Sequence, residues 1–65
     1  MNINHKDYWR ELLRRLEPYL EEKGKMSRLA EYLDVPRQHV FKWVREGMGP
    51  NYNYGKRIEE WIEKQ

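Results

Sequence analysis

Basic and amide side chains that could bind an anion gather in one part of this chain. Residues 25 to 45 hold five basic and two acidic side chains, a charge of +3, whereas the whole chain carries +2. The basic members are Lys25, Arg28, Arg37, Lys42 and Arg45. Such a segment can hold phosphate groups by charge and hydrogen bonds, without a covalent step. The residue types therefore favour non-covalent recognition of an anionic partner, although a solvated helix face can carry the same charge.

Residues suited to catalysis are scarce. The chain has no cysteine and no threonine, Ser27 is its only serine, and neither His5 nor His39 has a catalytic or ligand partner nearby in the sequence. There is no glycine-rich phosphate loop. Three acidic residues have the pattern of a solvated helix face rather than of a metal site. They are Glu59, Glu60 and Glu63. We therefore expect no enzyme, no metal site and no cofactor.

The length of 65 residues limits the architecture. A chain of this size buries only about 60% of the surface that its unfolded form exposes, so we expect a single domain over residues 1–65 with one small core. Three Trp, five Tyr and one Phe supply large apolar side chains for that core. No apolar run approaches the ~20 residues that cross a bilayer, and the N-terminal segment lacks the apolar region of a signal peptide. These features predict a soluble, cytoplasmic protein.

Hydrophobic spacing predicts four to five helices, the first of which has the strongest periodic signal. Asn4 and Asp7 are plausible caps for this helix. Its apolar residues recur at three- and four-residue steps. They are Tyr8, Trp9, Leu12, Leu13, Leu16 and Leu20. Pro18 lacks a backbone donor, so the helix should kink or restart there. Gly24 is expected to take a positive φ at a helix end, before a helix that begins near Met26 or Ser27.

Two short helices and a final helix should follow, each with one apolar face. These faces are Met26, Leu29, Ala30 and Leu33, then Pro36, Val40, Trp43 and Val44, then Tyr54, Ile58, Trp61 and Ile62. Asn51 or Asn53 can cap the final helix. On the helix over residues 36–46, the polar side chains lie nearly opposite the apolar arc. They are Gln38, Lys42 and Arg45, flanked by Phe41 and His39. With no strand of convincing length, the fold class is predicted to be all-α.

Several apolar residues resemble the helix-turn-helix of the phage repressor and Cro-like superfamily over about 22 residues. They are Leu29, Ala30, Leu33, Val35, Val40 and Trp43. In that superfamily a small residue in the first helix lies ten positions before a β-branched residue, where the two helices touch, and Ala30 and Val40 have this separation. The resemblance implies a compact, lambda-repressor-like bundle of four to five helices. It also implies a phage or bacterial transcription regulator, such as a repressor, that binds double-stranded DNA in the cytoplasm or nucleoid as a homodimer.

The resemblance also implies roles for individual residues, because the second helix of such a motif lies in the major groove. The expected base-reading residues are Arg37, Gln38, Phe41 and Lys42. The expected phosphate-contacting residues are Lys25, Ser27, His39, Arg45, Asn51, Asn53 and Lys56. Arginine can pair with guanine, and glutamine with adenine, through two hydrogen bonds each. Phe41 has two interpretations, contact with a thymine methyl group and packing beside the first helix.

The turn between the two helices departs from the usual residues of the superfamily. Asp34 stands where glycine is common, and aspartate can still adopt left-handed backbone geometry. Pro36 stands where serine or threonine usually caps the second helix. The cap is therefore expected from another residue, such as Asp34.

A second interpretation makes the same bundle a protein-interaction module or a fragment of a larger regulator. A protein partner would require an apolar stripe on the outer face of the helix over residues 36–46, where only Phe41 is apolar. The sequence therefore favours DNA. For a homodimer, Met48, Tyr52 and Trp61 are candidate interface residues, although the tryptophans are expected mainly in the core.

Overall fold

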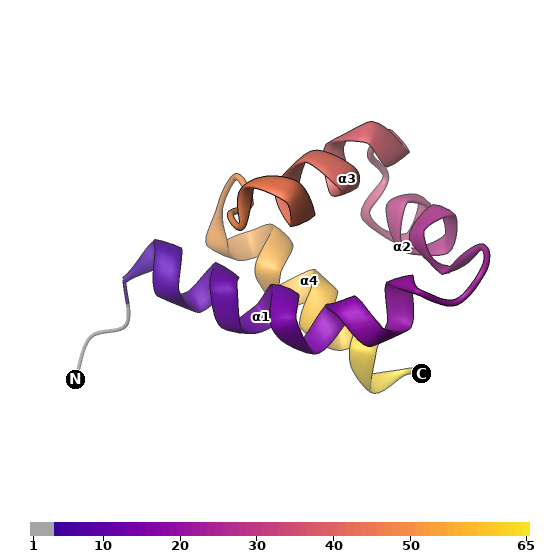
Figure 1. Ribbon diagram of the computed structural model, residues 1–65, viewed down its shortest axis with the longest axis horizontal. Coiled ribbons are helices and arrows are strands. Elements are labelled where there is room, and N and C mark those ends of the chain that lie inside the picture. The colour runs from indigo at the N-terminus through magenta and orange to yellow at the C-terminus, as the bar shows by residue number, and fades with distance from the viewer. Residues whose placement is uncertain (1–3) are drawn as a thin grey trace.

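Four helices follow one another along the residues that the computed structural model describes, 4–65 (Figure 1). They are α1, His5–Leu20; α2, Lys25–Leu33; α3, Arg37–Glu46; and α4, Tyr52–Glu63. Within residues 4–65 there is no strand, which confirms the predicted all-α class. The predicted fifth helix is absent from this range, since α1 continues to Leu20 instead of dividing at Pro18.

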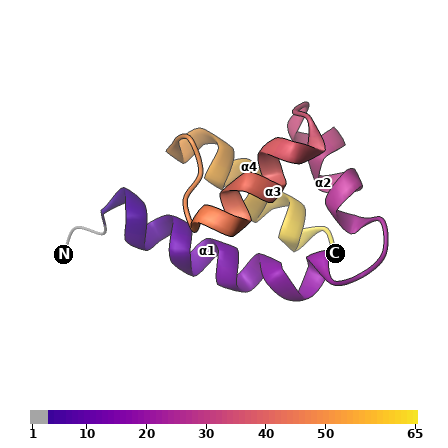
Figure 2. The same ribbon diagram turned by 45° about the horizontal axis from the view of Figure 1, so that its top comes forward.

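The core forms where the apolar faces of all four helices meet. Its buried members are Trp9, Leu12, Leu13, Leu16, Leu29, Ala30, Leu33, Val40, Trp43, Ile58, Trp61 and Ile62. α1 packs against α4 and α2, while α2 packs against α3 and α4 (Figures 1 and 2). These residues are those that helical spacing assigned to the apolar faces, so the predicted use of the three tryptophans as core residues is confirmed.

α1 begins as predicted and ends differently. The Asn4 side chain accepts a hydrogen bond from the Asp7 backbone N–H at 2.8 Å, so Asn4 is the N-cap. The prediction that the helix restarts at Pro18 is wrong. Pro18 lies in the last turn of α1, where its missing donor affects only the end of the ladder, and the preceding Leu16 is fully buried. Packing therefore holds this turn helical despite the proline.

Aromatic side chains connect α3 to its neighbours at one end. The Trp43 ring lies 6.0 Å from the Trp9 ring of α1 and 5.5 Å from the Tyr54 ring of α4, measured between centroids. From this contact α3 rises away from α1 toward its own N-terminus (Figure 2). The outward face of α3 is consequently left uncovered along the rest of its length.

A hydrogen bond between α1 and α4 makes stability depend on pH. The Tyr8 hydroxyl donates to Oε2 of Glu59. Burial first, and then the hydrogen bond and charge of Glu59, raise the pKa of the Tyr8 hydroxyl well above its ordinary value. Tyr8 therefore keeps its hydroxyl proton in the folded chain at a pH where it loses that proton in the unfolded chain, in which a tyrosine has a pKa of about 10.

We expect the free energy of unfolding to fall as the pH rises above about 10, because the unfolded state then binds fewer protons than the folded state. Below that pH the contribution of Tyr8 is fully present. Denaturant titrations at pH 9 and pH 11 should show a steeper loss in the wild type than in Tyr8→Phe. All other side chains are the same in the two proteins, so the difference between the two slopes reports Tyr8. Equal slopes would contradict this assignment.

Candidate functional site

The turn between α2 and α3 sets the direction of the exposed helix. Asp34 adopts left-handed geometry, with φ 59° and ψ 46°, and its backbone N–H donates to the carbonyls of Ala30 and Glu31. The Val35 N–H donates to the Ala30 carbonyl at 3.0 Å. These hydrogen bonds close the end of α2 as an αL C-cap does. The predicted left-handed conformation of Asp34 is confirmed.

Asp34 does not cap α3, so that prediction is wrong. The N-cap of α3 is Pro36, with φ −61° and ψ 145°, and no side chain accepts a hydrogen bond there. The left-handed backbone commits Asp34 to the end of α2, while Pro36 supplies the extended conformation from which α3 starts. The first turn of α3 therefore has no side-chain cap, and its residues 37 and 38 are exposed.

Replacing Asp34 by glycine should stabilise the fold by about 0.5–1 kcal/mol, because glycine adopts left-handed geometry without a Cβ clash. Thermal unfolding would measure the gain. Asp34→Ala is the control, since it removes the same negative charge from the C-terminus of α2 but keeps a Cβ. Alanine should destabilise the fold. If alanine stabilises it as much as glycine does, then charge and not backbone geometry is the cause.

Arg57 of α4 holds the end of α2 in a way that the sequence did not reveal. Its guanidinium donates to the Tyr32 carbonyl at 2.7 Å and to the Leu33 carbonyl at 3.4 Å. These carbonyls belong to the last turn of α2, where an intrahelical partner is lacking. Lys64 lies over the Tyr32 ring at 4.8 Å. Because 25 residues separate Arg57 from Tyr32, no local pattern could identify this contact.

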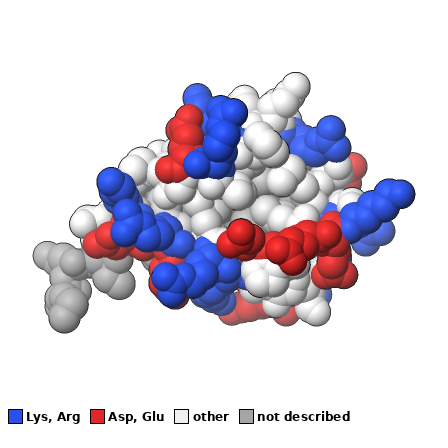
Figure 3. Space-filling view, in the orientation of Figure 1, with Lys and Arg blue, Asp and Glu red and all other residues white. Residues whose placement is uncertain are grey.

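The two faces of α3 differ as predicted. Val40 and Trp43 are buried against the core, and Val40 and Ala30, only 1% and 4% exposed, are both in the tightly packed interior. The opposite face carries the exposed residues Arg37, Gln38, His39, Phe41, Lys42 and Arg45. Figure 3 shows basic side chains over α3 with an acidic group beside them, and a mixture of basic and acidic side chains along the side where α1 runs. Within residues 4–65 no cation of α3 forms an ion pair, and the pair found there joins Arg14 to Glu11 at 3.7 Å.

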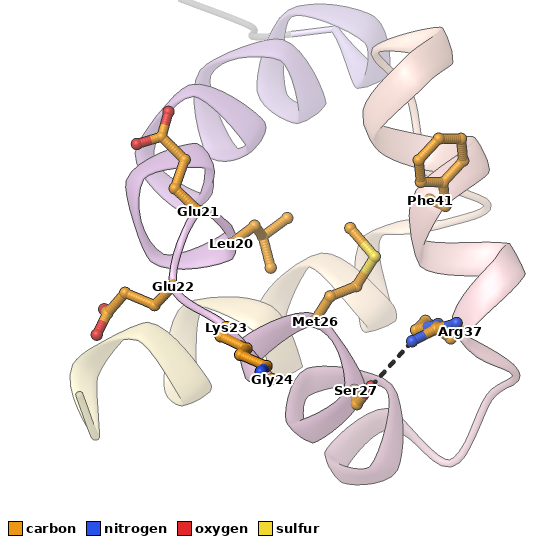
Figure 4. A pocket seen from close by; sticks show the side chains of 9 residues that line it. All are labelled: Leu20, Glu21, Glu22, Lys23, Gly24, Met26, Ser27, Arg37 and Phe41. Carbon is orange, nitrogen blue, oxygen red and sulfur yellow. Dashed lines mark hydrogen bonds between the residues drawn. The ribbon is translucent and has the colours of Figure 1, made fainter.

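Several predicted site residues lie around one hollow at the start of α3. It has a volume of about 600 Å³ and lies between the end of α1, the start of α2 and α3. Leu20 and Met26 project into it, and Phe41 and Arg37 border it from α3 (Figure 4). The Arg37 Nη1 atom is 3.5 Å from the Ser27 hydroxyl, a long contact that brings these two predicted residues together.

Phe41 does not pack beside α1, which removes one of its two interpretations. Its side chain is 55% exposed, and it is not among the apolar residues that pack on the core. Gln38, Met26 and Arg37 border a smaller extension of the hollow beside its ring. The sequence assigned Met26 and Leu20 to core faces. Both do pack against the core, but they are only partly buried and also line the hollow.

The remaining predicted residues divide by position. Asn51, Asn53 and Lys56 lie at the start of α4, which follows the end of α3 (Figure 1). Asn51 is the N-cap there, and its side chain accepts from the Tyr54 N–H at 3.1 Å. Lys25 points elsewhere. Its Nζ atom donates to Oε1 of Gln65 at 2.5 Å and lies 5.9 Å from the Trp61 ring, so it is held at the far end of α4.

No group of three or more His, Cys, Asp or Glu side chains between residues 4 and 65 could hold a metal ion. Over the same range, no helix is sufficiently long and apolar to cross a membrane. The candidate site is therefore the outward face of α3, with its exposed basic and amide side chains and the hollow at its start. Comparison with protein-family models, curated proteins and solved structures finds no significant match.

Proposed function

We propose that this domain is a sequence-specific DNA-binding protein, in which α2 and α3 form a helix-turn-helix within a lambda-repressor-like bundle. α3 would lie in the major groove of double-stranded DNA, as the recognition helix of such a motif does. The observation that carries the proposal is the exposed face of α3. It presents three cations and an amide that form no ion pair with any other residue between 4 and 65, on a helix whose other face is anchored by Val40 and Trp43. The expected role is transcription regulation.

The positions of the side chains support a division of roles. Arg37 and Gln38 lie in the first turn of α3, which is closest to the bases in this docking mode, and Phe41 and Lys42 lie one turn further along. His39 and Arg45 lie elsewhere on the exposed side of α3, Ser27 lies in α2, and Asn51, Asn53 and Lys56 surround the start of α4. These six residues are proposed to contact phosphates. Lys25 is the weakest member of the predicted set because Gln65 and Trp61 hold it away.

We propose that two copies bind together, because one domain of this size reads only a few base pairs and a second copy would read another half-site about 34 Å away. Of the three candidate interface residues, Trp61 is 5% exposed and belongs to the core. Met48 and Tyr52 are 37% and 55% exposed, so they remain candidates for the contact between copies.

Selection from a random pool of duplex DNA tests the proposed function. The wild-type protein should enrich one sequence motif, and its log affinity for that motif should fall with log salt at a slope of roughly −4 to −5 for each bound subunit, if each subunit neutralises about four to six phosphates. Enrichment of no motif, together with weak binding of any duplex, would show that the proposed function is wrong.

Lys56→Ala should weaken binding of all duplexes by a similar factor and reduce the magnitude of the salt slope by about 1 for each bound subunit, since phosphate contacts carry no sequence information. Lys56 is exposed, and its Nζ atom lies 5.8 Å from the Tyr52 ring, so the fold does not depend on it. Binding to the selected site and to a scrambled duplex at several salt concentrations measures both effects. A loss confined to one base position would instead identify Lys56 as a base reader.

One observation favours the second candidate function, a helical module that binds another protein or forms part of a larger regulator. The apolar side chains of Leu20, Met26 and Phe41 share the hollow between α1, α2 and α3 (Figure 4). A protein partner would bury these residues. Met26→Ala should therefore weaken the binding of that partner while leaving the affinity for DNA nearly unchanged. The basic residues around Phe41 make DNA the better supported partner.

A further inference from the structure

Phe41 stands apart from the other apolar residues of α3 because its ring faces outward. Val40 and Trp43 are 1% and 9% exposed, whereas Phe41 is 55% exposed. The ring contributes little to the core, so its removal should leave the fold intact. An apolar ring exposed on the helix that carries the proposed binding residues could itself contact the partner.

The neighbours of the ring are polar and basic. Arg37 lies one turn before Phe41 and Arg45 one turn after it, and the guanidinium carbon of Arg45 is 6.0 Å from the ring centroid. Gln38 borders the smaller extension of the hollow beside the Phe41 ring. A row in which arginines flank one apolar ring is complementary to a polyanion that carries a single apolar group between its charges. A purely apolar protein surface would leave both guanidinium groups without partners.

The major groove of DNA has such a group. Among the atoms that base pairs expose there, the 5-methyl group of thymine is apolar, and phenylalanine is one of the side chains that can pack on it. We propose that Phe41 packs on a thymine methyl group and thereby makes thymine a required base of the recognised sequence. This inference depends on the proposed function, since it names what one residue of that face recognises.

The position of the thymine follows from helix geometry. Four residues separate Arg37 from Phe41, a rise of about 6 Å along α3, whereas base pairs are stacked about 3.4 Å apart. If α3 runs along the groove, the thymine is about two base pairs from the base that Arg37 contacts. Arg37 and Phe41 therefore contact two nearby bases of the same half-site.

Replacement of thymine by deoxyuridine tests the contact, because uracil differs from thymine only by the missing methyl group. In the duplex selected by the wild-type protein, each thymine is replaced in turn and the Kd is measured. One replacement should weaken wild-type binding by about fourfold, the expected effect of one buried methyl group. For Phe41→Ala the same replacement should change the Kd by less than about 1.5-fold. Arg14→Ala, which changes an exposed residue of α1 outside the proposed binding face, should keep the fourfold effect.

The outcomes separate this inference from the proposed function. If the wild type selects a motif but tolerates deoxyuridine at every position, only the thymine contact is overturned, and the Phe41 ring is left for a protein partner. A deoxyuridine effect that persists unchanged in Phe41→Ala also overturns it, because another side chain then reads the methyl group. If the wild type selects no motif, the proposed function and this inference fail together.

Discussion

Gly49→Ala should destabilise the domain by about 3 kcal/mol, at the upper end of the usual cost of overpacking. A Cβ atom on residue 49 would lie 2.3 Å from both Cη2 and Cζ2 of Trp9 and 2.5 Å from Cζ3. Trp9 is fully buried, and the loop at Gly49 is also held by the His5 ring, whose Nε2 donates to the Gly49 carbonyl at 3.1 Å. Neither side of the clash can move easily. For a chain of this size the loss corresponds to a fall in Tm of roughly 12–24 °C.

Gly47→Ala is the matched control for this prediction. Gly47 lies in the same loop with φ +75°, and an added Cβ meets no atom within 4 Å. Its replacement should therefore cost only the backbone strain of a left-handed residue, about 1 kcal/mol. Thermal unfolding of both variants separates steric overlap at Gly49 from the general effect of replacing a loop glycine. Equal losses for the two variants would contradict the steric explanation.

A double-mutant cycle with Trp9→Phe isolates the contact itself. Phenylalanine lacks the large indole ring system whose atoms meet the added Cβ, and the buried Nε1 of Trp9 has no hydrogen-bond partner within residues 4–65, so no hydrogen bond is lost. In the Trp9→Phe background, Gly49→Ala should cost at least 1 kcal/mol less than in the wild type. An unchanged cost would mean that the alanine acts on the loop and not on the ring.

Arg37→Ala should weaken binding to the selected DNA sequence by about 1–3 kcal/mol, or roughly 5- to 150-fold, if the guanidinium contacts a guanine through two hydrogen bonds. Arg37 is exposed in the first turn of α3, and its hydrogen bond to the Ser27 hydroxyl, at 3.5 Å, is long. Its loss should leave the fold intact. A second selection with the variant should show relaxed preference at one base position and unchanged preference at the others.

Arg14→Ala supplies the charge-matched control. Its side chain lies on α1, is 74% exposed and is paired with Glu11, so the substitution removes one positive charge away from the outward face of α3. Electrostatics alone should then change the affinity by no more than about twofold. If both variants weaken binding equally, or if Arg37→Ala lowers affinity for every sequence alike, Arg37 is a phosphate contact and not a base reader.

Local features of the sequence were sufficient to predict the helices and their buried faces. The spacing of Ile58, Trp61 and Ile62 predicted the buried face of α4, and Asn4 and Asn51 are N-caps as expected. The left-handed Asp34 was also predictable. Each of these features depends on residues within about four positions of one another, a range over which backbone hydrogen bonds and side-chain spacing decide the conformation.

Only part of the candidate site could be predicted from local features of the sequence. Helical spacing correctly placed Gln38, Lys42 and Arg45 on the outward face of α3. It left the position of Phe41 open between two interpretations, because a residue at the edge of a helical arc is buried or exposed according to how far the neighbouring helix lies from it. Here α1 is separated from α3 at this end by the hollow, so the ring is exposed.

The sequence by itself determined an all-α chain with a basic face on residues 37–45 and apolar faces for a single core. Only the tertiary structure decided that α1 passes unbroken through Pro18, that Arg57 holds the end of α2, and that Lys25 turns toward Gln65. It also decided that residue 49 must be glycine beside Trp9. These contacts join residues up to 40 positions apart, so they depend on where the helices cross, which hydrophobic spacing does not specify.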